Sequence, residues 1–266
     1  MMSVARVRGI ELAYEVSGVG QPIVLLHGFP FNRTLWREQV GALSERYCVI
    51  TVDLRGHGET PATRAPATME EMAGDVAALL DDLRIERVVL GGLSMGGYVA
   101  LAFCRLFPGR VGALVLADTR PQADTDEARL TREETAARAI AEGMHTVADA
   151  MLPKLLAPST QEERPEVVAR VREMILNTDP QGAASALRGM AVRRDHTEFM
   201  REINCPTLII VGSLDPITPL ADAELMNREI RGSRLEVIAG AGHVSNVERP
   251  AEFNRALENF LRELEA

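Results

Sequence analysis

Lysine is almost absent from this chain: Lys154 is the single lysine among 266 residues, and no glycine-rich loop precedes it. A Walker-type phosphate loop needs a lysine directly after such a loop, so that loop is excluded, and Schiff-base chemistry is disfavoured with it. Acidic residues outnumber basic residues by 38 to 29, which gives a net charge of -9. Nucleic acid is therefore not an expected partner.

Cysteines and long hydrophobic runs are also scarce. The three cysteines, Cys48, Cys104 and Cys205, lie far apart in apolar runs, which indicates buried thiols in a reducing compartment. No stretch reaches 18 uninterrupted apolar residues, and the first residues lack the pattern of a signal peptide. We therefore expect a cytoplasmic protein that does not act at a membrane. Its oligomeric state stays open, with a homodimer as one alternative.

The strand patterns predict an α/β fold with a mostly parallel, eight-stranded sheet and helices on both faces. Residues 10–16 alternate apolar and polar and precede Gly18 and Gly20, which predicts an antiparallel hairpin at a sheet edge. Later runs are short and continuously apolar, as buried parallel strands are: residues 23–26, 49–52, 88–90, 113–117, 207–211 and 235–238. Helical spacing is found at residues 68–83, 95–107 and 250–264.

A long segment without strand patterns interrupts this alternation. Between Thr119 and Asn204 the sequence is charged and favours helices, with Pro153, Pro158 and Pro180 separating the patterns. The predicted helices cover residues 127–142, 145–156, 163–176 and 180–192. We interpret residues 121–204 as a helical cap carried by one core of residues 1–120 and 205–266.

The most specific local pattern is a Gly-x-Ser-x-Gly turn at residues 92–96, directly after a buried strand and before a helix. This arrangement places a serine on a strained turn and lifts its hydroxyl above the sheet, so it predicts Ser94 as a nucleophile. Gly92 and Gly96 leave room for close backbone packing. A phosphate-binding turn is the alternative, but the spacing of a dinucleotide motif is not met and no lysine follows.

A serine hydroxyl is a weak nucleophile, so it needs a histidine base, and that histidine needs an acid to orient it. His243 follows the last predicted strand and is the expected base, and Asp215 follows the strand before it and is the expected acid. Asp118, after the strand at residues 113–117, is the alternative acid or a cap of the next segment. The order serine, acid, histidine is the one found in α/β hydrolases.

The other four histidines are weaker candidates for the base. His27 precedes the serine and is expected to brace its loop, and His57 is expected to make hydrogen bonds within a turn. His145 and His196 fall in the helical insertion, where they are either solvated or line a substrate pocket. Neither histidine nor cysteine shows the spacing of metal ligands, so no metal is expected.

A tetrahedral intermediate also needs amide donors for its oxyanion. The residue after the nucleophile, Met95, supplies one, and the loop after the strand at residues 23–26 supplies the other. In that loop, Gly28 permits a sharp turn and Phe29 is the expected donor. Phe29 is also expected to form part of the pocket wall.

Five segments in this order resemble the α/β-hydrolase superfamily over essentially the whole chain. They are the oxyanion segment at residues 27–30, the loop at 53–58, the turn at 92–96, the acid loop at Asp215, and Gly242 with His243. Within the superfamily, the sequences Gly-Leu-Ser-Met-Gly-Gly and Gly-His-Val-Ser-Asn-Val-Glu-Arg-Pro resemble 3-oxoadipate enol-lactonases and related small carboxylesterases. The resemblance implies a helical cap over the active site.

These observations predict a serine hydrolase that cleaves a small-molecule ester or lactone without a cofactor. The alternatives are a 3-oxoadipate enol-lactonase, a perhydrolase or haloperoxidase side activity, carbon–carbon bond hydrolysis, and a ligand receptor on the same fold. Ser94 in place of aspartate argues against haloalkane dehalogenases and epoxide hydrolases.

The substrate-contacting residues are predicted with less support from the sequence. Met95, Trp36, Met144 and Met151 are expected either to line an apolar acyl pocket or to pack in the core. Arg120 or Arg129 would bind a substrate carboxylate if the substrate has one. A solvated surface position is the alternative for both arginines.

Overall fold

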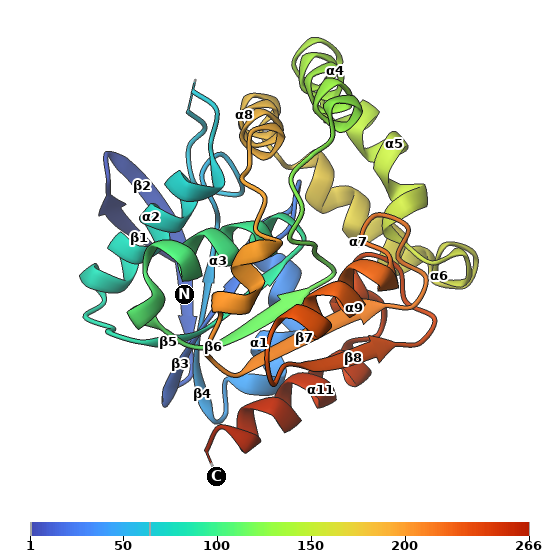
Figure 1. The fold of residues 1–266 in the computed structure, drawn as a ribbon. Helices are drawn as coiled ribbons and strands as arrows, with labels where there is room; N and C mark the ends of the chain where they lie inside the picture. The colour runs from blue at the N-terminus through green and yellow to red at the C-terminus, as the bar shows by residue number, and fades with distance from the viewer. Residues whose placement is uncertain (1, 64, 266) are drawn as a thin grey trace.

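The computed structural model describes residues 2–63 and 65–265 and confirms the predicted sheet. Over these residues, eight strands lie in the order β1-β2-β4-β3-β5-β6-β7-β8 (Figure 1). β1 and β2 form the antiparallel hairpin, β2 runs antiparallel to β4, and the remaining neighbours are parallel. The strands are β1 Met2–Val7, β2 Ile10–Ser17, β3 Gln21–Leu26, β4 Tyr47–Val52, β5 Val88–Leu93, β6 Val111–Ala117, β7 Thr207–Gly212 and β8 Arg234–Ile238.

The strand order reverses next to β3, and this reversal decides which face each helix covers. The chain passes from β3 to β4 in one direction and from β5 to β6 in the other, and both crossovers are expected to be right-handed. Their helices, α1 Arg37–Leu43 and α3 Met95–Leu106, therefore cover opposite faces. α2 Met69–Asp82 packs against α3, while α11 Pro250–Glu263 packs against α1. The loops after β3 and β5 meet at this switch point, where parallel sheets bind ligands.

The central strands are buried over nearly their whole length. Every residue of β5 and β7 is buried, and Gly112 is the one exception in β6. Such strands have helices on both faces, which explains why their sequences are continuously apolar rather than alternating. Each fully buried aliphatic side chain contributes about 1.5–3 kcal/mol to folding, so this layer provides a rigid base for the loops at its edge.

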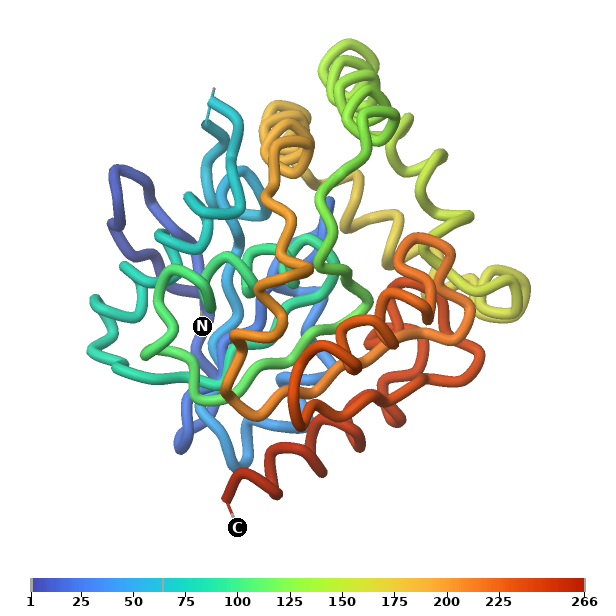
Figure 2. Tube along the Cα trace, in the orientation of Figure 1, coloured from blue at the N-terminus to red at the C-terminus, as the bar shows by residue number. Residues whose placement is uncertain are grey.

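Five helices lie between β6 and β7 in the described chain, in addition to the short turn η3 Glu198–Glu202 (Figure 1). They are α4 Asp126–Glu142, α5 Met144–Leu155, α6 Pro158–Glu163, α7 Pro165–Leu176 and α8 Pro180–Ala191. Figure 2 shows that the segment leaving β6 and the segment returning from α8 run side by side, and the His196 amide donates to the Pro121 carbonyl at 2.8 Å. The division into a core of residues 1–120 and 205–266 and a cap of 121–204 stays a prediction.

Two details of the predicted helices were wrong. The helix expected at residues 163–176 begins at Pro165, and α6 precedes it as a separate helix. Arg164 lies outside the helical region, at φ -130° and ψ 65°, because a residue before proline is disfavoured there. Pro153, expected as a separator, lies inside α5 instead, near its end. In contrast, the predicted start of α2 is confirmed: Thr68 and Glu71 form a reciprocal capping box.

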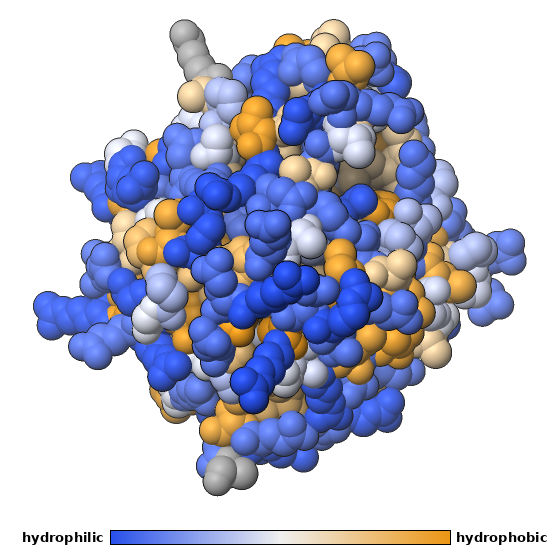
Figure 3. All heavy atoms as spheres, viewed as in Figure 1, coloured by the Kyte–Doolittle hydropathy of each residue, from blue (hydrophilic) through white to orange (hydrophobic). Residues whose placement is uncertain are grey.

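The cap approaches the core through small residues. A Cβ atom on Gly182 of α8 would lie 1.8 Å from the Gly56 carbonyl oxygen, and one on Gly189 would lie 1.8 Å from the Ala67 carbonyl oxygen. The Thr178 hydroxyl donates to the Pro30 carbonyl at 2.6 Å. Figure 3 shows a mostly polar surface that is hollowed where the cap helices stand over the core. No helix among the described residues is long and apolar enough to span a bilayer.

Candidate active site

Ser94 stands on a strained turn between β5 and α3. Its φ of +54° and ψ of -114° are unusual for a residue with a side chain. A Cβ atom on Gly92 would lie 2.1 Å from the Gly96 carbonyl oxygen, and one on Gly96 would lie 2.1 Å from the Leu26 carbonyl oxygen. Only glycine fits at these two positions, so the tight turn depends on the pattern read from the sequence.

The structure brings Ser94, His243 and Asp215 together in one hydrogen-bonded chain. The His243 Nε2 atom is 2.8 Å from Ser94 Oγ, and its Nδ1 atom is 2.8 Å from Asp215 Oδ2. All three side chains are buried, with Ser94 the most accessible at 9%. A carboxylate only accepts hydrogen bonds, so Nδ1 carries the proton and Nε2 is free to accept one from the serine. This is the geometry that general-base activation of a serine requires.

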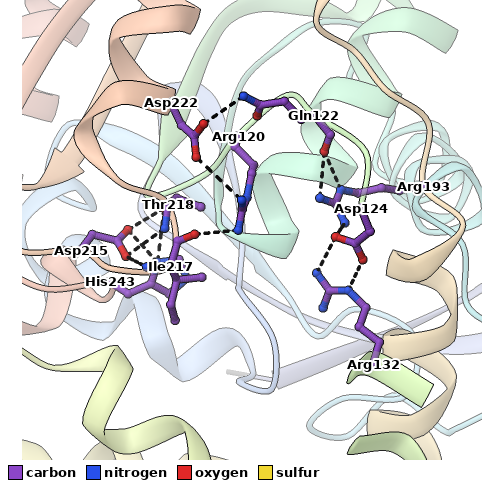
Figure 4. Close-up of polar contacts among 10 residues, drawn as sticks. All are labelled: Arg120, Gln122, Asp124, Arg132, Arg193, Asp215, Ile217, Thr218, Asp222 and His243. Atoms are coloured by element: carbon purple, nitrogen blue, oxygen red, sulfur yellow. Dashed lines mark hydrogen bonds and ion pairs between the residues drawn. The ribbon is translucent and has the colours of Figure 1, made fainter. Parts of the chain in front are cut away.

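Asp215 is held in place by the loop that follows it (Figure 4). Its Oδ1 accepts the amides of Ile217 at 2.8 Å and Thr218 at 3.1 Å, and its Oδ2 accepts the Thr218 hydroxyl at 2.5 Å. Burial alone would raise the pKa of Asp215, but the His243 charge and these donors hold it below its usual value. Asp215 therefore stays ionised at neutral pH and can stabilise a protonated His243.

The two expected oxyanion donors flank the serine. Met95 is the first residue of α3, so its amide is among those that a helix cannot satisfy internally. The loop after β3 lies directly beside the nucleophile, because a Cβ atom on Gly28 would be 3.2 Å from Ser94 Cβ. Phe29 follows in this loop and is 6% exposed. The structure thus places both predicted residues next to Ser94, and their role as donors stays a prediction.

Asp118, the alternative acid, occupies a different position. It is fully buried at the end of β6 with a φ of +43°. Its carboxylate accepts the Gly212 amide at 2.8 Å and the Ser245 hydroxyl at 2.5 Å, and thereby joins the end of β7 to the segment after His243. Burial, together with the Asp215 charge, raises the pKa of Asp118 well above its usual value. Asp215, rather than Asp118, contacts the histidine ring.

The histidines of the core loops brace those loops. The His27 Nε2 atom accepts the Leu54 amide at 3.0 Å, while its Nδ1 atom donates to the Gly28 carbonyl at 2.9 Å. His57 donates from Nδ1 to the Arg55 carbonyl at 3.1 Å. Burial lowers the pKa of His27 to about 4 and that of His57 to about 3, so both rings are neutral.

The two histidines of the insertion differ from each other. His145 is exposed in α5. His196 is 3% exposed, and its ring packs edge-on against Phe199 at 5.9 Å. The expectation of a solvated side chain was therefore wrong for His196, because it lies where the returning cap segment packs on the core.

The predicted substrate-contacting residues lie in different surroundings. Trp36 is 1% exposed and its ring packs against that of Phe253 in α11 at 6.0 Å, so it lies in the core, which the sequence left open as the alternative to the acyl pocket. Met144 is buried and Met151 is half-buried, and both pack into the hydrophobic cluster. A contact between these two methionines and a substrate stays a prediction.

Arg120 is already engaged with the acid loop (Figure 4). It donates to the Ile217 carbonyl at 2.6 Å and lies 3.9 Å from the Asp222 carboxylate, which in turn accepts the Gln122 amide at 2.9 Å. These contacts connect Arg120 to the loop that carries Asp215. Its role in binding a substrate carboxylate stays a prediction.

A cavity of about 660 Å³ lies between α7 and the core, away from this site. Its wall includes Arg33, Arg37, Arg170 and Met174, and none of the three residues of the hydrogen-bonded chain. This cavity is therefore separate from the hydrogen-bonded chain of Ser94, His243 and Asp215.

Two contributors to the site were missed from the sequence. Thr218 lies three residues after Asp215, a spacing at which a side chain can return to an aspartate, so a local signal was present. Glu248 accepts the amide of Gly242, the residue before His243, at 2.7 Å. Glu248 lies in the motif at residues 242–250 that carries the resemblance to enol-lactonases, but the motif alone does not say what its side chain contacts.

A serine on a strand-to-helix turn, joined to a histidine and an aspartate that follow later strands, defines the α/β-hydrolase class. Residues 21–250 match the family described as alpha/beta hydrolase fold, and the chain belongs to this family. The predicted superfamily is thereby confirmed.

Relatives of known structure and function agree with this class. The chain is 31% identical to 3-oxoadipate enol-lactonase 2 of Acinetobacter baylyi, covering 87% of this chain and 85% of the relative. It superimposes on a thermophilic esterase from Thermogutta terrifontis with a TM-score of 0.97 and 41% identity over all of both chains. The enol-lactonase from Burkholderia xenovorans LB400 gives a TM-score of 0.92 at 33% identity, covering 98% of this chain and 100% of that one.

Proposed function

We propose that this protein is a serine hydrolase that cleaves carboxylic esters or lactones through an acyl-enzyme intermediate. The single observation that carries the proposal is the hydrogen-bonded chain from Ser94 through His243 to Asp215. The names of the relatives, which include an esterase and enol-lactonases, support the same reaction class. The substrate is a small molecule, and the cap of residues 121–204 closes over its acyl group.

The reaction follows from the hydrogen bonds. His243 Nε2 takes the proton of Ser94 as Oγ bonds to the carbonyl carbon, and the carbonyl electron pair moves to the oxygen. The amides of Phe29 and Met95 stabilise that oxyanion. The intermediate collapses, the ester oxygen leaves with the proton from His243, and the acyl group remains on Ser94. A water molecule, deprotonated by His243, then releases the acid and restores the serine.

Replacing the nucleophile tests the proposal. We expect Ser94→Ala to lower kcat on a short acyl ester by at least about 10,000-fold, because the covalent step is lost. The measurement is steady-state hydrolysis of a 4-nitrophenyl ester panel, with mass spectrometry of the protein after treatment with a fluorophosphonate. Wild type should gain one phosphonyl group and Ser94→Ala should gain none. Full activity in Ser94→Ala would refute the proposal.

A lactone that bears a carboxylate is the second candidate substrate, because two relatives are named enol-lactonases. Arg120 is the residue predicted to bind that carboxylate, and it also donates to the Ile217 carbonyl. Comparing kcat/KM for a carboxylated lactone and for its methyl ester separates the two candidates. A preference for the free carboxylate above about 10-fold would favour the lactonase, since one charge-assisted contact contributes about 1.5–3 kcal/mol. Equal rates would favour a general esterase.

A further inference from the structure

Glu248 is a buried carboxylate that the proposed reaction does not use. It ends the short helix α10 Ser245–Glu248 and is 0% exposed. Its Oε1 atom accepts the Gly242 amide at 2.7 Å, and its Oε2 atom accepts the Ala157 amide at 2.8 Å. Gly242 precedes His243, and Ala157 connects cap helices α5 and α6. One carboxylate therefore joins the loop of the catalytic base to the cap.

Further contacts join the same two segments. The amides of His243 and Val244 donate to the Leu155 carbonyl at 2.9 and 3.3 Å. Arg164, between α6 and α7, donates to the Glu248 carbonyl oxygen at 2.7 Å. The histidine loop is thus bonded to cap residues on its backbone as well as through the Glu248 side chain.

The histidine loop and the cap segment at residues 155–157 pack closely at Gly242. A Cβ atom on Gly242 would lie 2.8 Å from the Ala157 nitrogen, 2.9 Å from the Leu155 oxygen and 3.0 Å from Glu248 Oε1. Only glycine therefore fits at residue 242, and the backbone of the histidine loop packs directly on that of residues 155–157. A displacement of the cap at residues 155–157 therefore changes the position of the backbone that carries the His243 ring.

We propose that Glu248 is a positioning residue that couples the cap to the catalytic base, so that His243 is correctly placed only when the cap segment at residues 155–157 is seated. The inference rests on the proposed function of Ser94 and His243. It adds that the cap controls the rate of the chemical step as well as the choice of substrate. Burial raises the pKa of the Glu248 carboxyl, in keeping with a group excluded from water.

Glu248→Gln tests this coupling with almost no change in side-chain size. The amide oxygen accepts one of the two backbone N–H groups, while the amide NH₂ meets the other N–H and cannot accept it. We expect kcat to fall at least 10-fold with KM changed less than 3-fold, and Ser94 phosphonylation by a fluorophosphonate to slow by a similar factor. Glu252→Gln in α11 is the matched control, because this exposed residue loses the same charge outside the network.

A second variant covers the case in which Glu248→Gln does not fold. Arg164→Met removes the cap contact to the Glu248 carbonyl oxygen and leaves the carboxylate in place; the Arg164 side chain is 35% exposed. We expect kcat to fall by a factor between two and five relative to Glu252→Gln, again without a matching rise in KM. A lower melting temperature with kcat unchanged from the control in both variants would overturn the coupling and leave Glu248 a structural anchor. A rise in KM alone would overturn it too.

The two proposals fail in different ways. An inactive wild type that does not react with fluorophosphonate contradicts the proposed function. A reactive wild type whose reaction rate is matched by Glu248→Gln contradicts only the coupling.

Discussion

The carboxyl edge of the sheet and the cap are built by different means. At the sheet edge, each functional side chain follows a strand and is fixed by hydrogen bonds, some within its own loop, as for Asp215 and Thr218, and some to distant segments, as for Asp118 and Ser245. The cap consists of helices, three of which begin with proline at Pro158, Pro165 and Pro180. The first arrangement fixes single atoms, while the second fixes whole helices. Substitutions at the edge should therefore change kcat, and substitutions in the cap away from its contacts with Glu248 should mainly change KM.

The largest expected fall in kcat at the sheet edge comes from replacing Asp215. Asp215→Asn places an amide where His243 Nδ1 donates, so the histidine loses the orientation it needs as a base. We expect kcat to fall by about 10,000-fold, as for other triads of this type, with KM little changed. Steady-state kinetics on the best ester measures this. Asp118→Asn is the control carboxylate at the same edge, and if it lost more activity than Asp215→Asn, the assignment of the acid would be wrong.

A smaller effect is expected at the neck of the cap. Asp124 pairs with Arg132 of α4 and with Arg193 on the returning segment (Figure 4). The Arg193 guanidinium lies 4.3 Å from the centre of the Tyr98 ring. Removing one partner of a buried ion pair costs about 3–5 kcal/mol. We therefore expect Asp124→Asn to lower the melting temperature and to raise KM more than it lowers kcat. An unchanged KM with a reduced kcat would contradict the expectation that this part of the cap affects KM and the sheet edge affects kcat.

The same residue predicts a pH dependence of stability. Burial opposes the ionisation of Asp124, but its two arginine partners hold its pKa below the usual value of about 3.9. A lowered pKa in the folded state adds stability above the unfolded pKa, and this stability is lost as the pH falls through the folded value. Melting curves between pH 7 and pH 3 should therefore drop less steeply for Asp124→Asn than for wild type. Parallel curves would show that Asp124 contributes nothing to acid unfolding.

The smallest effect concerns Arg120, which lies where core and cap meet. Arg120→Met removes one hydrogen bond to the Ile217 carbonyl, an interaction that contributes about 1 kcal/mol. We expect kcat to fall about 2- to 5-fold on neutral and carboxylated esters alike. A rise in KM confined to carboxylated substrates would show instead that Arg120 binds the substrate.

The sequence predicted most of the fold because its signals are local. The continuously apolar runs before Ser94 and before the acid loop mark central strands, and Thr68 with Glu71 marks the start of a helix. The short helix α6 was missed because its six residues are too few to show a helical period. The burial of His196 was missed because it depends on how the returning segment packs, which no local pattern encodes.

The candidate site divides in the same way. Ser94, Asp215 and His243 could be found because each follows a strand, and the carboxyl ends of parallel strands meet at one edge. For Trp36 and Arg120 the sequence left a substrate contact open beside a core or surface position, because side-chain chemistry alone does not say what a residue contacts. Trp36 packs on Phe253 and Arg120 bonds to the Ile217 carbonyl, both of which are distant in sequence.

Local sequence patterns predicted most strands and helices in their order along the chain, the strained serine turn and the candidates for the triad, because periodicity, glycine spacing and strand ends are properties of short segments. The packing of distant segments places Asp215, rather than Asp118, in contact with His243, and it lets Glu248 bond both to the loop of the base and to the cap. Asp215 and His243 are 28 residues apart, and Ala157 and Glu248 are 91 residues apart. Such contacts form when separate elements pack together, so no local sequence pattern predicts them.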